Sequence, residues 1–243
     1  MKNIKDKKDF TGEMTKQETF SALFYLPFHI ILIPLIIGRL MSEGWLNEAD
    51  ANVLCYVIGI VYLLIFEFKF LKREFYKLWD NPLGAVWQIL VCYFAMLAMN
   101  MIVAGIISGI EYITSTTVTV SNQNNEAIVE MAGEATGKTK VIAIYLAPIV
   151  EEILFRGGIF CSLHKRNRTA AYIISILAFS VYHVWGYAAD DPSYWLYIIQ
   201  YIPASYVLCR CYEKTDSIWD SIFLHMFING VALNALMLLE ELL

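Results

Sequence analysis

The sequence predicts an all-α membrane protein, a polytopic bundle of about seven transmembrane helices. Of its 243 residues, 58% are hydrophobic and only 17% are charged. A soluble domain is nearer half apolar and a quarter charged, so these charges are too few to cover a surface that faces water. Several apolar runs are also long enough to cross a bilayer, which takes about 20 residues in a helix. We therefore expect lipid to be the main solvent of this chain.

Seven apolar segments satisfy this length, and each is expected to form one transmembrane helix. In chain order they lie near residues 20–40, 52–70, 83–109, 140–162, 170–188, 194–211 and 217–239. We expect a single membrane domain, 1–243. Within it, 1–139 contains spans one to three and a polar loop at 110–139, and 140–243 contains spans four to seven.

The positive charges predict the orientation in the membrane. Most of the 18 Lys and Arg residues fall in segments that alternate regularly with the spans: Lys2, Lys5, Lys7, Lys8, Lys16, Lys69, Lys72, Arg73, Lys77, Lys165, Arg166, Arg168, Arg210 and Lys214. The opposite segments hold only Arg39, Lys138 and Lys140. Because cytoplasmic loops are rich in Lys and Arg, the N-terminus is expected in the cytoplasm and the C-terminus outside.

Five cysteines are present, and none forms a C-x-x-C pair. All lie in or beside apolar runs, which argues against a disulfide scaffold or a zinc ribbon. We expect no cofactor, no bound metal and no nucleic-acid partner. The sequence leaves the oligomeric state open.

Ionisable side chains at membrane depth are costly and tend to mark function. Three expected spans contain such groups: Glu151, Glu152 and Arg156 in the fourth, His183 in the fifth, and His225 with Asn229 in the seventh. Three spans that each supply a Glu or His at similar depth are much less often structural than one isolated pair. By contrast, His29 in the first span is expected only to hydrogen-bond to a neighbouring helix.

The two adjacent glutamates are expected to have different surroundings. Glu152 and Arg156 are four residues apart, so they share a helix face and can form an ion pair. Glu151 lies about 100° round the helix and is left without that partner. A carboxylate without a counter-ion in a low-dielectric cavity suits a general base.

The backbone of the fourth span is also unusual. Pro148 removes a helical hydrogen bond one turn before Glu151. Such backbone is tolerated at membrane depth where it is buried in protein or lines a water-filled cavity. Gly157 and Gly158 would let a neighbouring helix approach closely. We therefore expect a water-containing pocket enclosed by spans four, five and seven.

These residues form three motifs in order. Glu-Glu-x-x-x-Arg runs from Glu151 to Arg156, Phe-x-x-x-His is the pair Phe179 and His183, and His-x-x-x-Asn begins at His225. The set resembles the CAAX-protease and bacteriocin-processing family of intramembrane endopeptidases, also called the Abi family. The resemblance covers about 150–235.

The resemblance implies a glutamate-dependent peptide hydrolase without a metal, with its catalytic core in spans four, five and seven. Glu151 and His183 would activate a water molecule. His225 and Asn229 would stabilise the tetrahedral oxyanion.

The other motif residues would support this site. Glu152 with Arg156 would brace it, and Phe179 would pack beside it. The partners implied are the lipid bilayer and a membrane-associated or lipidated peptide or protein, such as a pheromone or bacteriocin precursor or a CAAX-type substrate. In members that process prenylated proteins the cavity opens to the cytosol, which here would be the side rich in Lys and Arg.

Three alternatives remain open. The protein could be a zinc-dependent membrane peptidase with Glu151, His183 and His225 as ligands, since three N/O ligands plus water form a common catalytic zinc set. It could also be a non-catalytic membrane scaffold or immunity protein. A transporter that uses Glu151 as a proton relay is the third, although no repeated halves are present in the sequence.

Overall fold

The computed structural model describes residues 10–12, 14–114 and 137–242, and every regular element in these ranges is a helix. The expected all-α class is therefore confirmed. The expected polar loop at 110–139 lies mostly outside the described residues. Its first part is not a loop, because α5 continues to Thr114, and the chain is helical again from residue 137.

The elements follow one another with short connections. They are α1 Lys16–Pro27, η1 Phe28–Leu32, α2 Ile33–Ser42, α3 Glu48–Phe66, α4 Phe68–Leu78, α5 Pro82–Thr114, η2 Ile142–Leu146, α7 Ala147–Glu152, η3 Ile153–Cys161, α8 Ser162–His164, α9 Arg168–Asp190, η4 Pro192–Tyr197, α10 Ile198–Thr215 and α11 Ile218–Leu242. The elements η1, η2 and η3 are wide π-helical stretches, and η4 is a 3₁₀ helix.

Five helices in the described part of the chain are long and apolar enough to cross a membrane. They are Lys16–Ser42, Glu48–Phe66, Pro82–Gly109, Arg168–Asp190 and Ile218–Leu239. These correspond to the expected spans one, two, three, five and seven. Their outward side chains are apolar: Phe20, Leu64, Phe94, Ile174 and Leu238 are all exposed. A multi-pass membrane protein follows from this arrangement.

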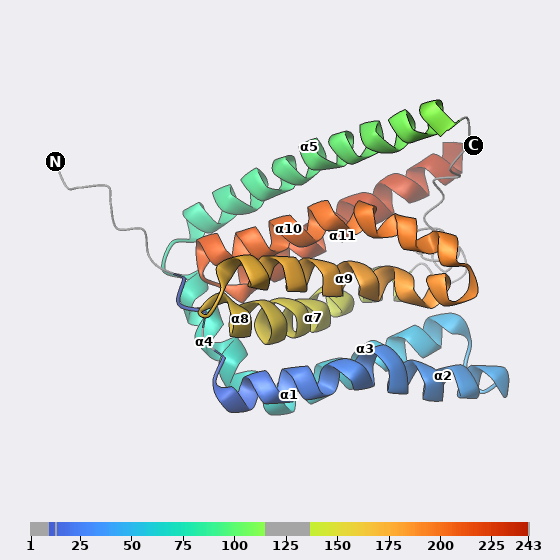
Figure 1. Cartoon of the computed structure of the whole chain (residues 1–243). Coiled ribbons are helices and arrows are strands. Elements are labelled where there is room, and N and C mark those ends of the chain that lie inside the picture. The colour runs from blue at the N-terminus through green and yellow to red at the C-terminus, as the bar shows by residue number, and fades with distance from the viewer. Residues whose placement is uncertain (1–9, 13, 115–136, 243) are drawn as a thin grey trace.

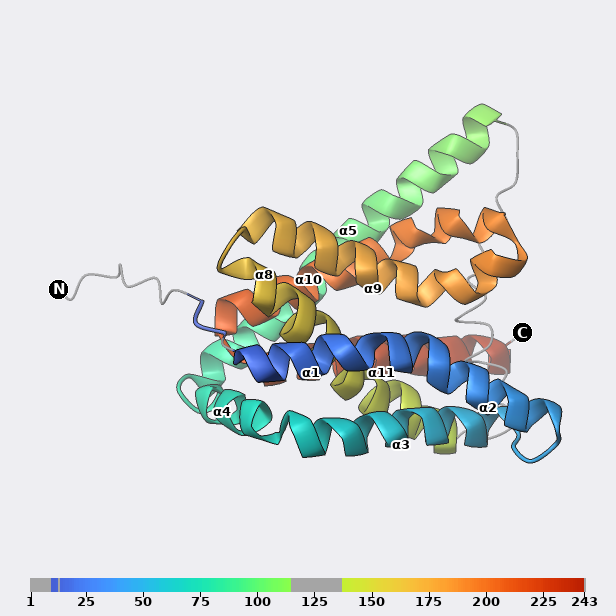
Figure 2. The ribbon, with the colours of Figure 1, turned by 60° about the horizontal axis from the view of Figure 1, so that its bottom comes forward.

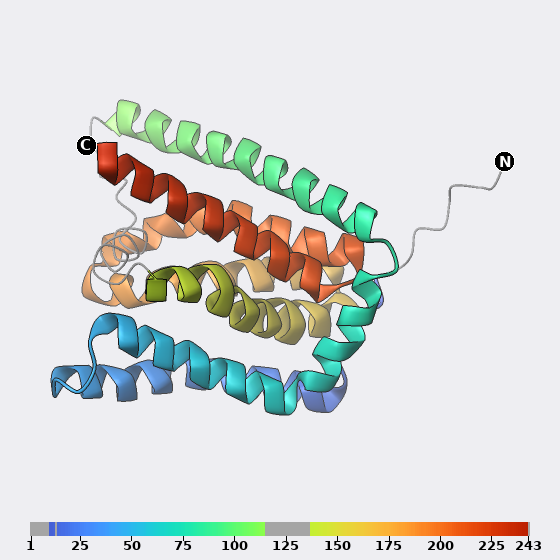
Figure 3. The same cartoon turned by 180° about the vertical axis from the view of Figure 1, so that it is seen from behind.

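The expected fourth and sixth spans are helical but do not meet the same criteria, so the count of seven is not established. The fourth, which we call the central helix (residues 137–164), carries charges and changes helix type repeatedly. It lies between α1 and α3 on one side and α9, α10 and α11 on the other (Figures 1 and 3). Every residue from 150 to 161 is buried, so protein rather than lipid surrounds it.

Small residues allow α1 to pack closely on the central helix, as the sequence predicted. A Cβ atom added to Gly158 would lie 3.2 Å from the Cβ atom of Ala22. One added to Gly157 would lie 3.1 Å from the Cε atom of Met14. An added Cβ atom at Gly158 therefore requires a small shift of α1, whereas one at Gly157 requires only the end of the Met14 side chain to move.

Wide helical turns surround the glutamates. Just before Pro148, the amide of Ala147 donates to the carbonyl of Ile142, five residues back. A second π-helical stretch, η3, begins directly after Glu152. Such turns are uncommon and occur frequently at functional sites.

The two expected groups of positive charge lie at opposite ends of the bundle. Residues 10–12, α4 and the 165–167 connection lie at one end, which we call the basic end (Figures 1 and 2). The 43–47 connection and the C-terminus lie at the other, which we call the opposite end. Among the described residues, the predicted alternation of basic segments is therefore confirmed, and the orientation in the membrane stays a prediction.

Candidate active site

Glu152 is surrounded by hydrogen-bond donors. Its carboxylate accepts from the hydroxyl of Ser221 at 2.6 Å and from Nδ1 of His225 at 2.9 Å. A nitrogen of the Arg156 guanidinium lies 3.1 Å away. The side chains of Glu152 and Arg156 are completely buried, so the predicted ion pair within the central helix is confirmed.

The Arg156 guanidinium is fixed on three sides. Besides Glu152, it donates to the carbonyl of Ser205 at 3.3 Å and to the Ser205 hydroxyl at 3.1 Å. Its carbon lies 4.1 Å from the centre of the Phe179 ring, a cation–π contact. Arg156 thus ties the central helix to α9 and α10.

Glu151 has a different environment, as expected from its position on the helix. One carboxylate oxygen accepts a hydrogen bond from the Tyr56 hydroxyl at 3.1 Å. The other lies 3.8 Å from Nε2 of His183 and 3.8 Å from Nε2 of His225. These separations are too long for direct hydrogen bonds and suit one bridging water or reacting group.

Both imidazoles are oriented by a second contact. Nδ1 of His183 lies 2.9 Å from the carbonyl of Phe179. Because a carbonyl only accepts, this nitrogen carries the proton, and the neutral ring presents the Nε2 lone pair toward Glu151. Nδ1 of His225 likewise donates to Glu152. His225 therefore connects the two carboxylates.

Phe179 packs at the centre of the cluster. Its ring centroid is 4.3 Å from that of His183 and 5.7 Å from that of His225. The ring also contacts the Arg156 guanidinium, and it makes an edge contact with Phe155, whose ring centroid is 5.4 Å away. This apolar ring therefore contacts the guanidinium and both imidazoles.

Asn229 lies one turn beyond His225 on α11. Its amide nitrogen donates to the carbonyl of Ala143 in η2 at 2.8 Å. An amide carries two N–H groups, so one remains for another acceptor. Asn229 and His225 line the same cavity.

Sequence reasoning missed the hydroxyl groups around Glu151. The Tyr56 hydroxyl lies 3.2 Å from that of Tyr182, which in turn lies 3.4 Å from Nε2 of His29. The expected contact of His29 with a neighbouring helix is thus confirmed. Tyrosines are common in membrane helices, so the sequence carries no signal that separates Tyr56 and Tyr182 from the others.

A cavity of about 1000 Å³ contains these groups. Glu151, Phe179, His183, His225 and Asn229 all line it. The expected enclosure by the central helix, α9 and α11 is confirmed, and α3, α5 and α10 also contribute walls. Within the described ranges, no group of three His, Cys, Asp or Glu side chains is arranged to hold a metal ion.

This fold and site define a multi-pass helical membrane protein with an acid and two imidazoles facing an internal cavity. Residues 139–231 match the model of the family described as "Type II CAAX prenyl endopeptidase Rce1-like". That range contains all three motifs. The resemblance to the CAAX-protease and bacteriocin-processing family is confirmed.

Two relatives cover most of the chain. The UPF0177 protein YxdF of Lactococcus lactis is 25% identical over 76% of this chain and 94% of its own length. The protein of Bacillus subtilis named "Putative membrane peptidase YdiL" is 25% identical over 89% of this chain and 87% of its own length. No solved structure matches the chain. Together the family match and the second relative support a membrane peptidase.

Proposed function

We propose that this protein is an intramembrane endopeptidase that uses Glu151 and His183 to activate water. The substrate would be a membrane-associated or lipidated peptide or protein. One observation carries the proposal. A Glu151 oxygen lies 3.8 Å from Nε2 of His183 and of His225 inside the cavity, while Glu152 is saturated with donors.

The geometry supports general-base hydrolysis without a metal. A water held between Glu151 and Nε2 of His183 would lose a proton as its oxygen bonds to the scissile carbonyl carbon. The proton would then pass to the leaving amine when the C–N bond breaks. Tyr56 would orient the Glu151 carboxylate through its hydrogen bond.

The oxyanion would be stabilised from α11. His225 can donate from Nε2 when that nitrogen carries a proton, and the Glu152 carboxylate that accepts from Nδ1 holds the ring in place. The free N–H of Asn229 provides a second donor. Two such donors aimed at a developing charge are the usual elements of an oxyanion hole.

The first test replaces Glu151. Glu151→Gln keeps the shape of the side chain and the Tyr56 contact but removes the base, so processing should be lost while thermal stability in detergent stays near that of the wild type. The measurement compares by mass spectrometry the peptides of cells that carry each form. Glu43→Gln, at an exposed acid that does not line the cavity, is the control. Unchanged processing in Glu151→Gln would contradict the proposal.

Two further results would favour the alternatives. Stoichiometric zinc in the purified protein, with activity lost in a chelator, would support the zinc-dependent peptidase. A biological effect that survives the combined change of Glu151→Gln and His183→Ala would support the scaffold or immunity protein.

A further inference from the structure

The cavity extends from the candidate active site in one direction only. On α3 its lining runs from Tyr56 to Glu48, and on α11 it runs from His225 to Leu236. The central helix contributes Thr139 as well as Glu151. Each of these helices therefore lines the cavity between the site and the opposite end of the bundle.

Polar residues line part of the cavity near the opposite end, and apolar residues of α5 and α11 form much of its side walls. Glu48, Asn52, Ser108 and Thr139 line the part near the opposite end. The side walls include apolar residues of α5 and α11: Met96, Val103, Ile107, Val231 and Leu233. Such a cavity, at the large end of the usual size range for ligand pockets, can admit an extended peptide segment.

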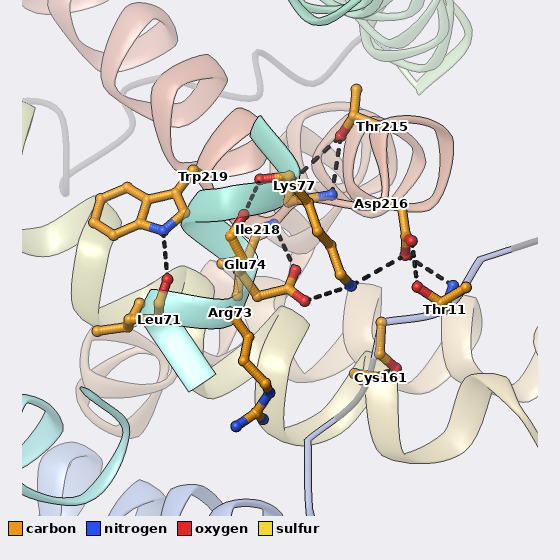
Figure 4. Close-up of polar contacts among 12 residues, drawn as sticks. Thr11, Leu71, Arg73, Glu74, Lys77, Cys161, Thr215, Asp216, Ile218 and Trp219 are labelled. Atoms are coloured by element: carbon orange, nitrogen blue, oxygen red, sulfur yellow. Dashed lines mark hydrogen bonds and ion pairs between the residues drawn. The ribbon is translucent and has the colours of Figure 1, made fainter. Parts of the chain in front are cut away.

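No described residue of the basic end lines the cavity. At that end α4 is bonded to the turn before α11 (Figure 4). A carboxylate oxygen of Glu74 accepts from the amide of Ile218 at 3.0 Å, at the first residue of α11. The Ser217 hydroxyl donates to the carbonyl of Glu74 at 3.1 Å, and the Trp219 indole donates to the carbonyl of Leu71 at 3.0 Å. These bonds tie α4 to the turn before α11.

Thr11 and Gly12 are also bonded at this end (Figure 4). The Thr11 amide donates to Asp216 at 2.8 Å, and Lys77 bridges Glu74 at 2.6 Å and Asp216 at 3.6 Å. The thiol of Cys161 donates to the carbonyl of Gly12 at 2.8 Å. Segments from four parts of the chain thus meet over the basic end.

We propose that substrate reaches Glu151 from the extracytoplasmic side of the membrane. This inference rests on the proposed function and on the positive-inside rule, which assigns the basic end to the cytoplasm. The substrate would then be a translocated peptide, or the outer segment of a membrane-anchored protein, rather than a cytosolic CAAX-type protein. The lining of the cavity runs toward the end poor in Lys and Arg, whereas the resemblance implies a cavity that opens on the side rich in them.

Cysteine labelling tests the path. Cys55 lines the cavity and is the one cysteine of the chain that is not buried, so Cys55→Ser provides the background. Three single changes are then made in this Cys55→Ser background. They are Asn100→Cys in the cavity wall, Glu43→Cys at the opposite end and Lys214→Cys at the basic end. The probe is a charged, membrane-impermeant thiol reagent, applied to intact cells and to sealed inside-out vesicles.

We expect Asn100→Cys and Glu43→Cys to be labelled in intact cells and Lys214→Cys only in inside-out vesicles. Labelling of Asn100→Cys from the vesicle side, or from neither side, would overturn the inference. So would labelling of Glu43→Cys from the cytoplasmic side, because the bundle would then be inverted.

The labelling does not require catalysis, so its failure is separable from failure of the proposed function. Repeating it in a Glu151→Gln background should give the same pattern. Processing that persists in Glu151→Gln while labelling stays on the outer side would contradict only the catalytic role. Loss of processing together with labelling from the cytoplasmic side would contradict only the access route.

Discussion

Glu151 and Glu152 are adjacent in α7, yet their surroundings differ completely. Glu152 accepts from Ser221 and His225 and is ion-paired with Arg156, whereas Glu151 contacts the Tyr56 hydroxyl and faces the cavity. The ion pair with Arg156 could be predicted, because both residues lie on one helix at a fixed spacing. The position of His225 between the two carboxylates could not be predicted, because it depends on where α11 packs.

The buried ion pair should be strongly coupled. Glu152→Gln or Arg156→Met alone leaves an unpaired buried charge and is expected to cost about 3–5 kcal/mol of the free energy of unfolding. The double variant removes both charges and should cost clearly less than the sum of the two. Unfolding of the purified protein in detergent measures each value.

The exposed pair Arg39 and Glu43 provides the matched control, with the same spacing and a distance of 2.7 Å. There a coupling of no more than about 0.5 kcal/mol is expected, because solvent screens both charges. If the losses of unfolding free energy in the Glu152→Gln and Arg156→Met variants simply add in the double variant, the buried pair does not stabilise the fold.

The central helix shows what could be predicted at the scale of an element. Its position, its proline and its close contact with α1 follow from residue types that have few alternatives. The wide turns η2 and η3 do not follow, because a π turn differs from an α turn by a single hydrogen-bond register. That choice is made by the packing of five surrounding helices rather than by local sequence.

Close packing at Gly158 predicts a sharp effect of one methyl group. Gly158→Ala places a Cβ atom 3.2 Å from that of Ala22 and should destabilise the protein by about 1–3 kcal/mol through forced displacement of α1. Gly38→Ala is the control, since nothing lies within 4 Å of the added atom in α2. It should be neutral or stabilising by up to about 1 kcal/mol. Equal effects of the two variants in thermal unfolding would contradict this.

The junction between α3 and α4 contains a buried acid, Glu67, just beyond the apolar span. Burial raises the pKa of Glu67 from 4.5 to about 7; neighbouring Glu18 adds to the shift, and Ser21 and Arg73 oppose it. The folded state therefore binds the proton more tightly than the unfolded chain. This contribution to stability is complete below about pH 4.5 and is lost as the pH rises through 7.

Glu67→Gln should remove that dependence. At pH 8 the variant is expected to be more stable than the wild type, on the order of 2 kcal/mol, because it avoids burying a charge. At pH 4.5 the two should be similar. Unfolding midpoints measured from pH 4.5 to 8 give the comparison, and a variant that follows the wild-type pH curve would count against this account.

At the scale of the whole molecule, hydropathy identified the five helices whose apolar faces are exposed. Hydropathy alone could not distinguish the central helix and α10 from these five lipid-exposed helices. Both lie inside the bundle, where burial in protein rather than contact with lipid decides which residues are tolerated. Charge alternation predicted which connections share an end, but not the direction of the cavity, which depends on how the helices spread.

The orientation can be measured directly. A fluorescent protein fused to the N-terminus should fold and emit in the cytoplasm, and alkaline phosphatase fused to the C-terminus should be active outside. This follows from the excess of Lys and Arg at the basic end. The swapped fusions are the controls and should both be inactive. Active phosphatase at the N-terminus would reverse the assignment.

The enclosure of the central helix has a consequence for biogenesis. A charged side chain at the centre of a lone membrane helix costs roughly 2.5–3.5 kcal/mol on insertion, and this helix carries three. Glu152 and Arg156 partly offset each other within the helix, and Tyr56 of α3 is made earlier, but Ser205, Ser221 and His225 belong to helices synthesised later. The charged stretch of the central helix therefore gains its full set of partners only after α10 and α11 have been translated and have packed around it.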